Sequence, residues 1–461
     1  MASVKGSKVI APARSVSAGG TDGFLYVGPY VHSIGLNDLQ VIEEGVIAVT
    51  NGKICAVDSK DNLNRVAEKF GISEQNFHFL DNGEFLIPGF VDTHIHAPQY
   101  PNAGLGYDKP LLGWLDHYTF PMEAKYSDEQ FAETIYNAVV KRTLSYGTTT
   151  ACYFATIHVA TAIVLADIVL KHGQRAFVGK VNMNVNHPSY YGESSENSLK
   201  DTETFVNAIL SKKNDLIKPI ITPRFAISCD MELMKKLSDI AKKHDVHIQT
   251  HISENRDEVK YVAELFPECK SYADVYDSAG LLTDKTILAH GVYLTDDEIK
   301  TIVKRSSSVS HCPTSNSCLR SGICHVRKLL QNGVQVGLGT DISGGYSPSI
   351  IEVMKAALAV SIDLSFEKDK SNQQTCALEL KEVFYLATLG GARALRLDNK
   401  IGNFEIGKEF DALVVSLRGE PGGVDVLTPL NTLELLQKFV YLGDDRNVKK
   451  VYVSGKIVKQ I

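Results

Sequence analysis

The sequence has no long apolar run, no close pair of cysteines and no glycine-rich nucleotide-binding motif. None of its apolar stretches approaches the ~20 residues that a membrane-spanning helix needs, so no transmembrane segment is predicted. The eight cysteines are scattered, and none forms the C-x2-4-C pair typical of zinc-binding cysteines. With no signal for export recognised, we expect reduced thiols and a cytoplasmic protein.

An excess of charge of either sign is also missing. The 461 residues carry 48 Lys and Arg against 54 Asp and Glu, a net charge of −6 that is spread along the chain. A mildly acidic chain without a basic patch gives no reason to expect nucleic acid or an anionic membrane as a partner. Residues 1–21 contain several serines, Lys5, Lys8 and Arg14 and no acidic residue, faintly like a transit peptide, but they lack a convincing amphipathic face. We expect residues 1–24 to form a flexible tail.

Both ends of the chain are predicted to be β-structure. Two short apolar runs flank Asn51-Gly52, a pair that tolerates the positive φ of a hairpin turn. Similar β patterns occur at 411–415 and 451–458. Because neither end is long enough to be stable alone, we expect residues 25–87 and 396–461 to form one small β-sandwich domain together.

Residues 88–395 are predicted to be an α/β domain. Strand-like apolar runs alternate there with amphipathic helices, and Ser127-x-x-Gln130 and Thr295-x-x-Glu298 have the spacing of helix-capping boxes. The eight runs are 85–91, 148–154, 176–181, 217–221, 246–249, 286–289, 308–310 and 334–339. Eight strands in this length favour a (β/α)8 TIM-like barrel over an open doubly wound sheet, since no glycine-rich fingerprint follows any run.

Histidine is plentiful, with 14 residues, and several lie where predicted strands end. His94 and His96 are two residues apart, so both side chains point to the same side of an extended strand. His251, His290 and Asp341 end three later runs. Buried structural histidines are the alternative explanation, but this number of them at the same end of a barrel favours a divalent metal site.

Several motifs resemble the amidohydrolase superfamily, and within it the guanine deaminases. The superfamily likeness lies in Pro88-Gly-Phe-Val-Asp-Thr-His94-Ile-His96, the histidines that end the fifth and sixth runs, and Gly339-Thr-Asp341. The narrower likeness lies in segments 94–100, 223–225, 251–258, 311–316, 339–346, 386–391 and 441–447. It extends from about residue 25 to the C-terminus.

The resemblance implies a metal centre made of His94, His96, His251 and Asp341. It implies one divalent ion, zinc, with iron as the alternative that some relatives use. Binuclear relatives have a lysine at the end of the fourth strand, and here that position reads Thr222-Pro-Arg224. Lys180, in the third strand, is expected to be structural.

The resemblance also implies catalytic roles. Glu254 would carry a proton to a ring nitrogen, His290 would orient the attacking water, and Asp341 would pass the water's proton to departing ammonia. Without the resemblance, Glu254 is equally consistent with a solvated carboxylate at a helix start. His311 is expected to be a buried structural histidine.

For substrate recognition the resemblance points to Gln99 and Arg224, an amide and a guanidinium able to read the edge of a fused ring. Phe225 and Trp114, the only tryptophan, are candidates for stacking on that ring. A surface salt bridge is the alternative for Arg224. The stretch from Gln99 to Glu123 is predicted to be a loop over the barrel mouth.

The expected activity is hydrolysis of guanine to xanthine and ammonia in purine catabolism. The expected partners are guanine and water, without nucleic acid or membrane, and the resemblance suggests a homodimer. A related enzyme acting on cytosine, a triazine or an adenosine derivative remains open, as does a non-catalytic scaffold. The cytidine-deaminase type of zinc site is excluded, because neither H-x-E nor P-C-x-x-C occurs.

Overall fold

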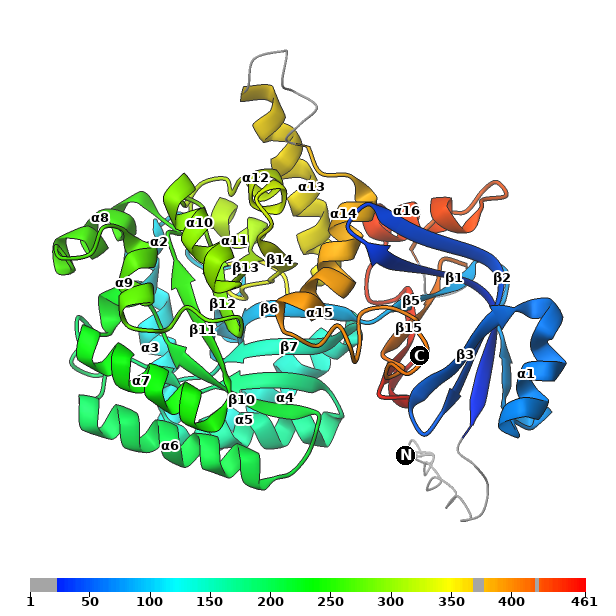
Figure 1. Ribbon diagram of the computed structural model, residues 1–461, viewed down its shortest axis with the longest axis horizontal. Helices are drawn as coiled ribbons and strands as arrows, with labels where there is room; N and C mark the ends of the chain where they lie inside the picture. The colour runs from blue at the N-terminus through cyan, green and yellow to red at the C-terminus, as the bar shows by residue number, and fades with distance from the viewer. Residues whose placement is uncertain (1–22, 368–376, 419–422) are drawn as a thin grey trace, which may run out of the picture.

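The computed structural model describes residues 23–367, 377–418 and 423–461, which form two separate sheets with their helices (Figure 1). Residues 1–22 of the predicted tail lie outside the described residues, whereas Phe24 already belongs to a strand. The sheet with most of the helices lies on the left of the view and the smaller one on the right. No helix in the described ranges combines the length and the apolar content that crossing a bilayer requires.

The larger sheet is the predicted barrel. Its strands are β6 (Phe90–His96), β7 (Thr148–Phe154), β8 (Arg175–Gly179), β9 (Val181–Asn182), β10 (Ile217–Pro223), β11 (His247–Ile252), β12 (Thr286–His290), β13 (Ser308–His311) and β14 (Gln335–Leu338). Neighbours run parallel in the order β6-β7-β8-β10-β11-β12-β13-β14, and short β9 also pairs with β10. The backbone N–H of Asp341, just after β14, donates to the carbonyl of His94 in β6 at 2.9 Å and brings the last strand back to the first.

Helices cover the outside of this barrel. They are α4 (Glu129–Ser145), α5 (Val159–His172), α6 (Ser195–Ser211), α7 (Met231–His244), α8 (Arg256–Leu265), α9 (Tyr272–Ser278), α10 (Asp296–Arg305), α11 (Pro313–Cys318), α12 (Val326–Gln331), α13 (Ile350–Glu367), α14 (Leu380–Tyr385) and α15 (Gly391–Ala394). The capping box from Thr295 to Glu298 is confirmed. The one predicted at Ser127 is wrong, because Asp128 caps α4 by accepting from the N–H groups of Gln130 and Phe131.

The run predicted as the first barrel strand, 85–91, is divided between the two sheets. Strand β5 (Glu84–Pro88) belongs to the small sheet, and β6 starts two residues later. Pro88 has no N–H for a continuous ladder. Gly89 lies so close to Thr149 that a Cβ would sit 2.2 Å from its hydroxyl oxygen. The Pro-Gly pair therefore separates the sheets, and the first barrel strand is shifted toward His96.

The small sheet joins the two ends of the chain, as predicted. Its strands are β1 (Phe24–Gly35), β2 (Asp38–Thr50), β3 (Lys53–Ser59), β4 (Phe77–Phe79), β5, β15 (Ala412–Ser416), β16 (Val448–Val453) and β17 (Lys456–Gln460), with α1 (Leu63–Phe70) and α16 (Thr432–Leu442) nearby. The order is β17-β16-β15-β5-β1-β2-β3, so β5 connects the strands from both ends. Tyr26 and Tyr452, one from each end, share a hydrogen bond of 2.7 Å between their hydroxyls.

A buried ion pair joins the two sheets at the base of the barrel. Arg175 starts β8, and its guanidinium donates to the carboxylate of Asp411, just before β15, at 3.0 to 3.3 Å. The same guanidinium donates to Glu409 at 2.7 Å. Removing one partner of such a buried pair strands the other charge, which gives this contact a structural role.

The segment between Gln99 and Glu123 is helical rather than a plain loop, contrary to the prediction. It contains 3-10 turns at Ala97–Asn102, helix α2 (Leu111–Trp114), π-helical turns at Leu115–Thr119 and helix α3 (Phe120–Glu123). The helices are too short to show a helical periodicity in the sequence, and the Pro, Gly and aromatic residues of the segment are also common in loops. The segment follows β6 directly and so packs over the mouth of the barrel.

Candidate active site

Five side chains meet at the mouth of the barrel because each lies at the carboxyl end of a strand. His94 and His96 lie at the end of β6, and His96 is its last residue. His251 lies near the end of β11, His290 ends β12 and Asp341 follows β14. All five are buried. In a (β/α)8 barrel this is the end at which active sites are built.

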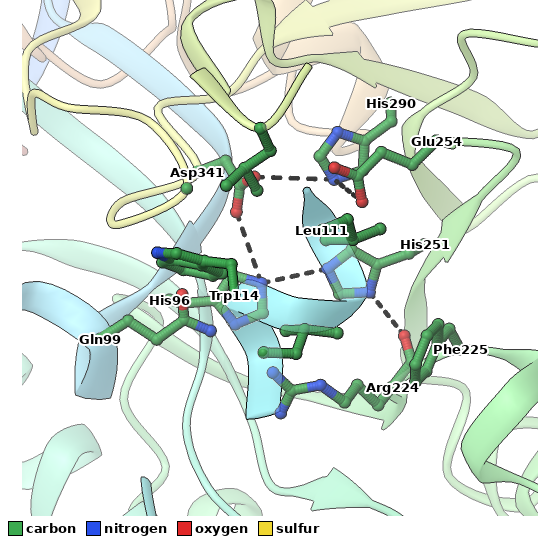
Figure 2. A pocket seen from close by; sticks show the side chains of 13 residues that line it. His96, Gln99, Leu111, Trp114, Arg224, Phe225, His251, Glu254, His290 and Asp341 are labelled. Carbon is green, nitrogen blue, oxygen red and sulfur yellow. Dashed lines mark hydrogen bonds and ion pairs between the residues drawn. The ribbon is translucent and has the colours of Figure 1, made fainter. Parts of the chain in front are cut away.

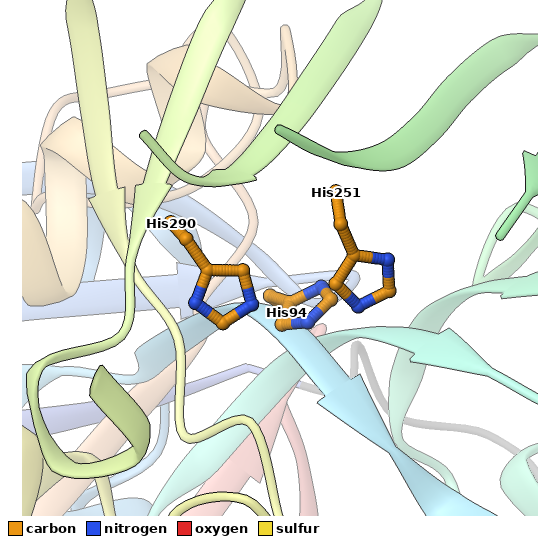
Figure 3. A group of neighbouring side chains, drawn as sticks. All are labelled: His94, His251 and His290. Carbon is orange, nitrogen blue, oxygen red and sulfur yellow. The ribbon is translucent and has the colours of Figure 1, made fainter. Parts of the chain in front are cut away.

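The distances among these groups are short. The Oδ1 atom of Asp341 lies 3.2 Å from Nε2 of His94 and 3.5 Å from Nε2 of His96. Nε2 of His96 is 3.1 Å from Nε2 of His251. The metal-binding atoms of His94, His96 and Asp341 lie within 4.8 Å of one another, as do those of His94, His251 and His290. Figure 3 shows the three rings of the second set gathered around one small volume.

Two of the rings are oriented by hydrogen bonds on their far side. Nδ1 of His251 lies 2.6 Å from the carbonyl oxygen of Arg224, and Nδ1 of His290 lies 2.8 Å from Oδ1 of Asn316. Each Nδ1 therefore carries the proton and donates it, which leaves the lone pair of Nε2 facing the site. Asn316 belongs to segment 311–316 of the guanine-deaminase resemblance, but the sequence does not indicate its role as the partner of His290.

The protonation of the cluster suits a metal. Burial lowers the pKa of His94, His96 and His251, so the rings are neutral. Burial acts to raise the pKa of Asp341, but its electrostatic interactions with His94 and His290 and its hydrogen bond with His94 outweigh burial and hold that pKa below its usual range. Nε2 of His94 is buried without a hydrogen-bond partner among the described residues. Neutral imidazoles, an ionised carboxylate and an unsatisfied nitrogen are the ligands a divalent ion requires, so these residues fit one.

The backbone at the site is strained. His290 has φ of 76° and Asp341 has φ of 44°, in the left-handed region that residues other than glycine rarely adopt. Asp92 holds the second of these turns by accepting from the N–H groups of His94 at 3.2 Å and Thr340 at 3.1 Å. Glycine is required at position 339, just before Thr340 and Asp341, because a Cβ there would lie 2.6 Å from the Ser310 hydroxyl oxygen. Strain that the surrounding contacts maintain is common at functional sites.

Glu254 is a buried acid, so the alternative of a solvated helix-start carboxylate is wrong. One carboxyl oxygen, Oε1, accepts from the hydroxyl of Ser321 at 3.0 Å, and the other, Oε2, lies 3.4 Å from Nε2 of His290. Burial raises the pKa of Glu254 to about 7. Burial acts to lower the pKa of His290, but the carboxylates of Glu254 and Asp341 outweigh it and raise that pKa. At neutral pH this pair can therefore gain or lose a proton.

A cavity of about 390 Å³ opens on this cluster. Its wall includes nearly all of the residues predicted for the site, together with four that were not. The lining residues are His96, Gln99, Leu111, Trp114, Leu115, Arg224, Phe225, His251, Glu254, His290, Leu319, Asp341 and Gly344. Figure 2 shows Gln99 and Arg224 along one side and His290 with Glu254 on the other. His94 is not part of this wall, and its ring packs against that of His96 with centroids 5.0 Å apart.

Arg224 is buried in an ion pair, which excludes the surface salt bridge considered from the sequence. Its two terminal nitrogens donate to the carboxylate of Glu123 at 2.6 and 3.1 Å. Nε2 of Gln99 donates to the same carboxylate at 2.9 Å. Glu123 was missed by the sequence analysis, since nothing in its surroundings in the chain distinguishes it from a surface acid.

The remaining candidates are also located. Trp114 is buried, and its indole N–H donates to the carbonyl of Leu105 at 3.0 Å. Phe225 is buried beside His251. His311 is buried as predicted, and burial lowers its pKa to about 3. Neither of its ring nitrogens has a hydrogen-bond partner within the described part of the chain. Lys180 is buried in an ion pair with Glu193.

A family model for the amidohydrolases, described as "Amidohydrolase family", matches residues 85–458. The chain belongs to the amidohydrolase family. Among its amidohydrolase relatives, guanine deaminase from Pongo abelii is 47% identical over 440 residues, covering 94% of this chain and 96% of the relative. The resemblance found from the motifs is thereby confirmed.

Solved amidohydrolase structures agree. Guanine deaminase from C. acetobutylicum, with guanine bound in its active site, superposes with a TM-score of 0.87 at 37% identity, covering 95% of this chain and all of the other. An adenosine deaminase from Xanthomonas campestris with bound zinc gives a TM-score of 0.79 at 26% identity, covering 94% of this chain and 92% of the other. Family membership and the histidine cluster together indicate a divalent metal ion as cofactor.

Proposed function

We propose that this chain is a guanine deaminase, which hydrolyses guanine to xanthine and ammonia. The observation that carries the proposal is one buried cavity in which a histidine and carboxylate cluster faces Gln99 and Arg224. The reaction forms a bond from a water oxygen to the ring carbon that carries the amino group, and breaks the bond from that carbon to nitrogen. The high identity to guanine deaminases supports the same substrate.

The metal would be held by His94, His96, His251 and Asp341, and we propose zinc, with iron as the alternative. A divalent ion held there would lower the pKa of a bound water toward ~7 and so would make a nucleophile available at neutral pH. The neutral rings and the ionised Asp341 support this assignment. Elemental analysis of the purified protein distinguishes zinc from iron.

Glu254, His290 and Asp341 would move and hold the protons. The carboxyl of Glu254 can protonate a ring nitrogen, because a pKa raised to about 7 by burial leaves it partly protonated at neutral pH. His290, anchored through Nδ1 by Asn316, keeps Nε2 facing the site, where it can orient the attacking water and stabilise the developing charge. Oδ2 of Asp341 lies 3.7 Å from that nitrogen, where it can take a water proton and pass it to the departing amine.

Gln99 and Arg224 would read the polar edge of guanine. Each retains donors that Glu123 does not use, and a carbonyl oxygen or ring nitrogen of the substrate can accept from them. A ring without those acceptors would leave buried donors unpaired, which discriminates strongly against it. Trp114 and Phe225 line the same cavity and offer flat apolar faces to the purine.

The test is a guanine-to-xanthine absorbance assay on purified protein, with adenine and cytosine as parallel substrates. We expect turnover of guanine that a strong chelator abolishes and that added zinc restores. Turnover of cytosine or adenine with guanine untouched would refute the substrate. No ammonia release from any of the three, in protein loaded with metal, would favour a scaffold instead.

We also propose a cytoplasmic homodimer, and a division of the chain into a barrel domain of residues 88–395 and a small β domain made of residues 25–87 and 396–461. The resemblance supports the dimer and the cytoplasmic location, and the separation of the two sheets supports the division. Light scattering on purified protein tests the dimer, and limited proteolysis tests the division into two domains.

A further inference from the structure

Glu123 is a fully buried carboxylate beside the cavity, and four donated hydrogen bonds converge on it. Its relative exposure is 0%, and it lies at the end of the short helix α3. Its Oε1 accepts from Gln99 at 2.9 Å and from Arg224 at 3.1 Å, and its Oε2 accepts from Arg224 and from the Tyr191 hydroxyl, both at 2.6 Å. Burying an ionised carboxylate is unfavourable unless it is paired in this way.

Glu123 fixes the plane of the Arg224 guanidinium. The contact is bidentate, with the two terminal nitrogens donating to different carboxylate oxygens. Phe120, one turn earlier in α3, has its ring 5.1 Å from the guanidinium carbon and supports one face of the same group. Because Glu123 holds one edge of the guanidinium and Phe120 supports one face, the group has little rotational freedom. Its remaining N–H groups therefore point in fixed directions.

The same carboxylate also orients Gln99 and ties three segments together. Because Nε2 of Gln99 donates to Glu123, the amide cannot rotate and exchange its oxygen for its nitrogen without losing that bond. Gln99 follows β6, Arg224 follows β10, and Tyr191 lies between β9 and α6. That last connection is itself anchored, since Glu193 pairs with the buried Lys180.

We propose that Glu123 is the positioning residue that makes Gln99 and Arg224 a fixed reader of a neutral purine ring. The inference rests on the proposed guanine deaminase function and deepens it. Glu123 is absent from the cavity wall and acts through its two partners. It also balances the charge of Arg224, so this side of the cavity offers oriented donors without a net positive charge.

The charge balance has a consequence for the product. Xanthine has two carbonyls beside its ring N–H groups and loses a ring proton more readily than guanine does. An unbalanced Arg224 would attract that anion and hold it in the cavity. Glu123 therefore favours binding of the neutral substrate over retention of the ionised product.

The experiment compares Glu123→Gln with wild-type enzyme in steady-state assays with guanine, and with xanthine as the added inhibitor. The glutamine side chain in this variant has an N–H group where one carboxylate oxygen of Glu123 accepts from Arg224. The two-point contact is therefore lost, and we expect the guanidinium of Arg224 to rotate away from its wild-type orientation. We expect KM for guanine to rise by about 10- to 100-fold, the range for a lost hydrogen bond to a charged group, with a much smaller change in kcat. The inhibition constant of xanthine should rise far less than KM for guanine, or should fall. This difference between the two constants should be larger at alkaline pH, where more of the xanthine is ionised.

Asp411→Asn is the matched control, because it disturbs the other buried arginine–carboxylate pair, between Arg175 and Asp411, far from the cavity. We expect Asp411→Asn to lower the unfolding temperature while KM, kcat and xanthine inhibition stay unchanged. Glu123→Asp keeps the charge but shortens the reach, so it should raise KM for guanine without strengthening xanthine inhibition. It decides the question if Glu123→Gln is not recovered as folded protein.

The outcomes separate the inference from the proposed function. If the wild-type enzyme does not deaminate guanine, the proposed function fails first. If it does, the inference is overturned by a Glu123→Gln enzyme whose KM stays within about twofold of wild type, or whose KM and xanthine inhibition constant rise by the same factor. Should only Glu123→Asp fold, an unchanged KM for guanine in that variant overturns the inference.

Discussion

The two ends of the barrel contain the same types of buried residue in different arrangements. The base has the Arg175–Asp411 ion pair and His247 at the start of β11, whereas the mouth has the Arg224–Glu123 pair and His251 near the end of the same strand. His247 has an ordinary structural partner, the backbone carbonyl of Leu395, 3.1 Å from its Nε2. His251 instead uses Nδ1 for a backbone carbonyl and directs Nε2 toward His96, 3.1 Å away.

This difference separates a structural polar group from a functional one. At the base, the charged groups join strands of two sheets and stabilise the contact between them. At the mouth, nitrogens with lone pairs face one another, and the backbone of His290 and Asp341 adopts strained positive φ values. Such a cluster is unfavourable by itself and is explained by a ligand that binds it. Burial and residue type are common to both ends, whereas the direction of the lone pairs and the backbone strain distinguish the mouth.

The largest expected effect comes from removing the imidazole at each end of β11. In His251→Ala one proposed ligand is lost, so we expect the protein to lose most of its metal and its guanine turnover together. In His247→Ala we expect the metal content and kcat to stay near wild type, with a lower unfolding temperature. Elemental analysis and the absorbance assay measure both. Full metal occupancy in His251→Ala would remove His251 from the ligand set.

The next effect tests a proton carrier at the mouth. Glu254→Gln keeps the shape of the side chain and its contact with Ser321 but cannot deliver a proton. We expect kcat for guanine to fall by roughly 10²- to 10⁴-fold, the usual contribution of general acid–base catalysis, while metal content stays unchanged. Loss of the metal would make Glu254 a ligand instead, and an unaffected kcat would leave it without a catalytic role.

A smaller effect is expected from changing the shape of each arginine without its charge. Arg224→Lys cannot form the two-point contact with Glu123, so we expect KM for guanine to rise by roughly tenfold or more with kcat less affected. Arg175→Lys should leave KM unchanged and lower the unfolding temperature. An equal KM in the two variants would mean that the mouth pair, like the base pair, is only structural.

Much of this comparison could be predicted from the sequence. The alternation of apolar runs and helices indicated the barrel, and the positions of His94, His96, His251, His290 and Asp341 at strand ends indicated the cluster. Strand ends are recognisable because a buried parallel strand is continuously apolar, and a polar residue that interrupts it is conspicuous.

The boundary at Pro88-Gly89, the helical turns near Trp114 and the role of Glu123 could not be predicted. A run of apolar residues does not tell which of two sheets each half joins, and turns of four or five residues are too short for a periodic pattern. The contacts of Glu123 connect it to residues 24, 68 and 101 positions away in the chain. Local sequence contains no trace of such distant partners.

The smallest expected effect is a pH dependence of stability at the base. Burial lowers the pKa of His247 to about 3 in the folded protein, against about 6.5 for an unfolded histidine. The unfolded chain therefore binds a proton that the folded one excludes, so this contribution to stability is complete above pH 6.5 and is lost as the pH falls below it. His247→Gln retains a donor for Leu395 but cannot titrate.

We expect the free energy of unfolding of His247→Gln to fall less steeply than that of the wild type between pH 6.5 and 4. The difference in slope should be up to roughly 1.4 kcal/mol per pH unit. Urea unfolding of both proteins, with chelator present throughout so that metal release does not contribute, measures the difference. Parallel curves would show that His247 titrates normally, and the burial that distinguishes a structural histidine at the base would then have to be reconsidered.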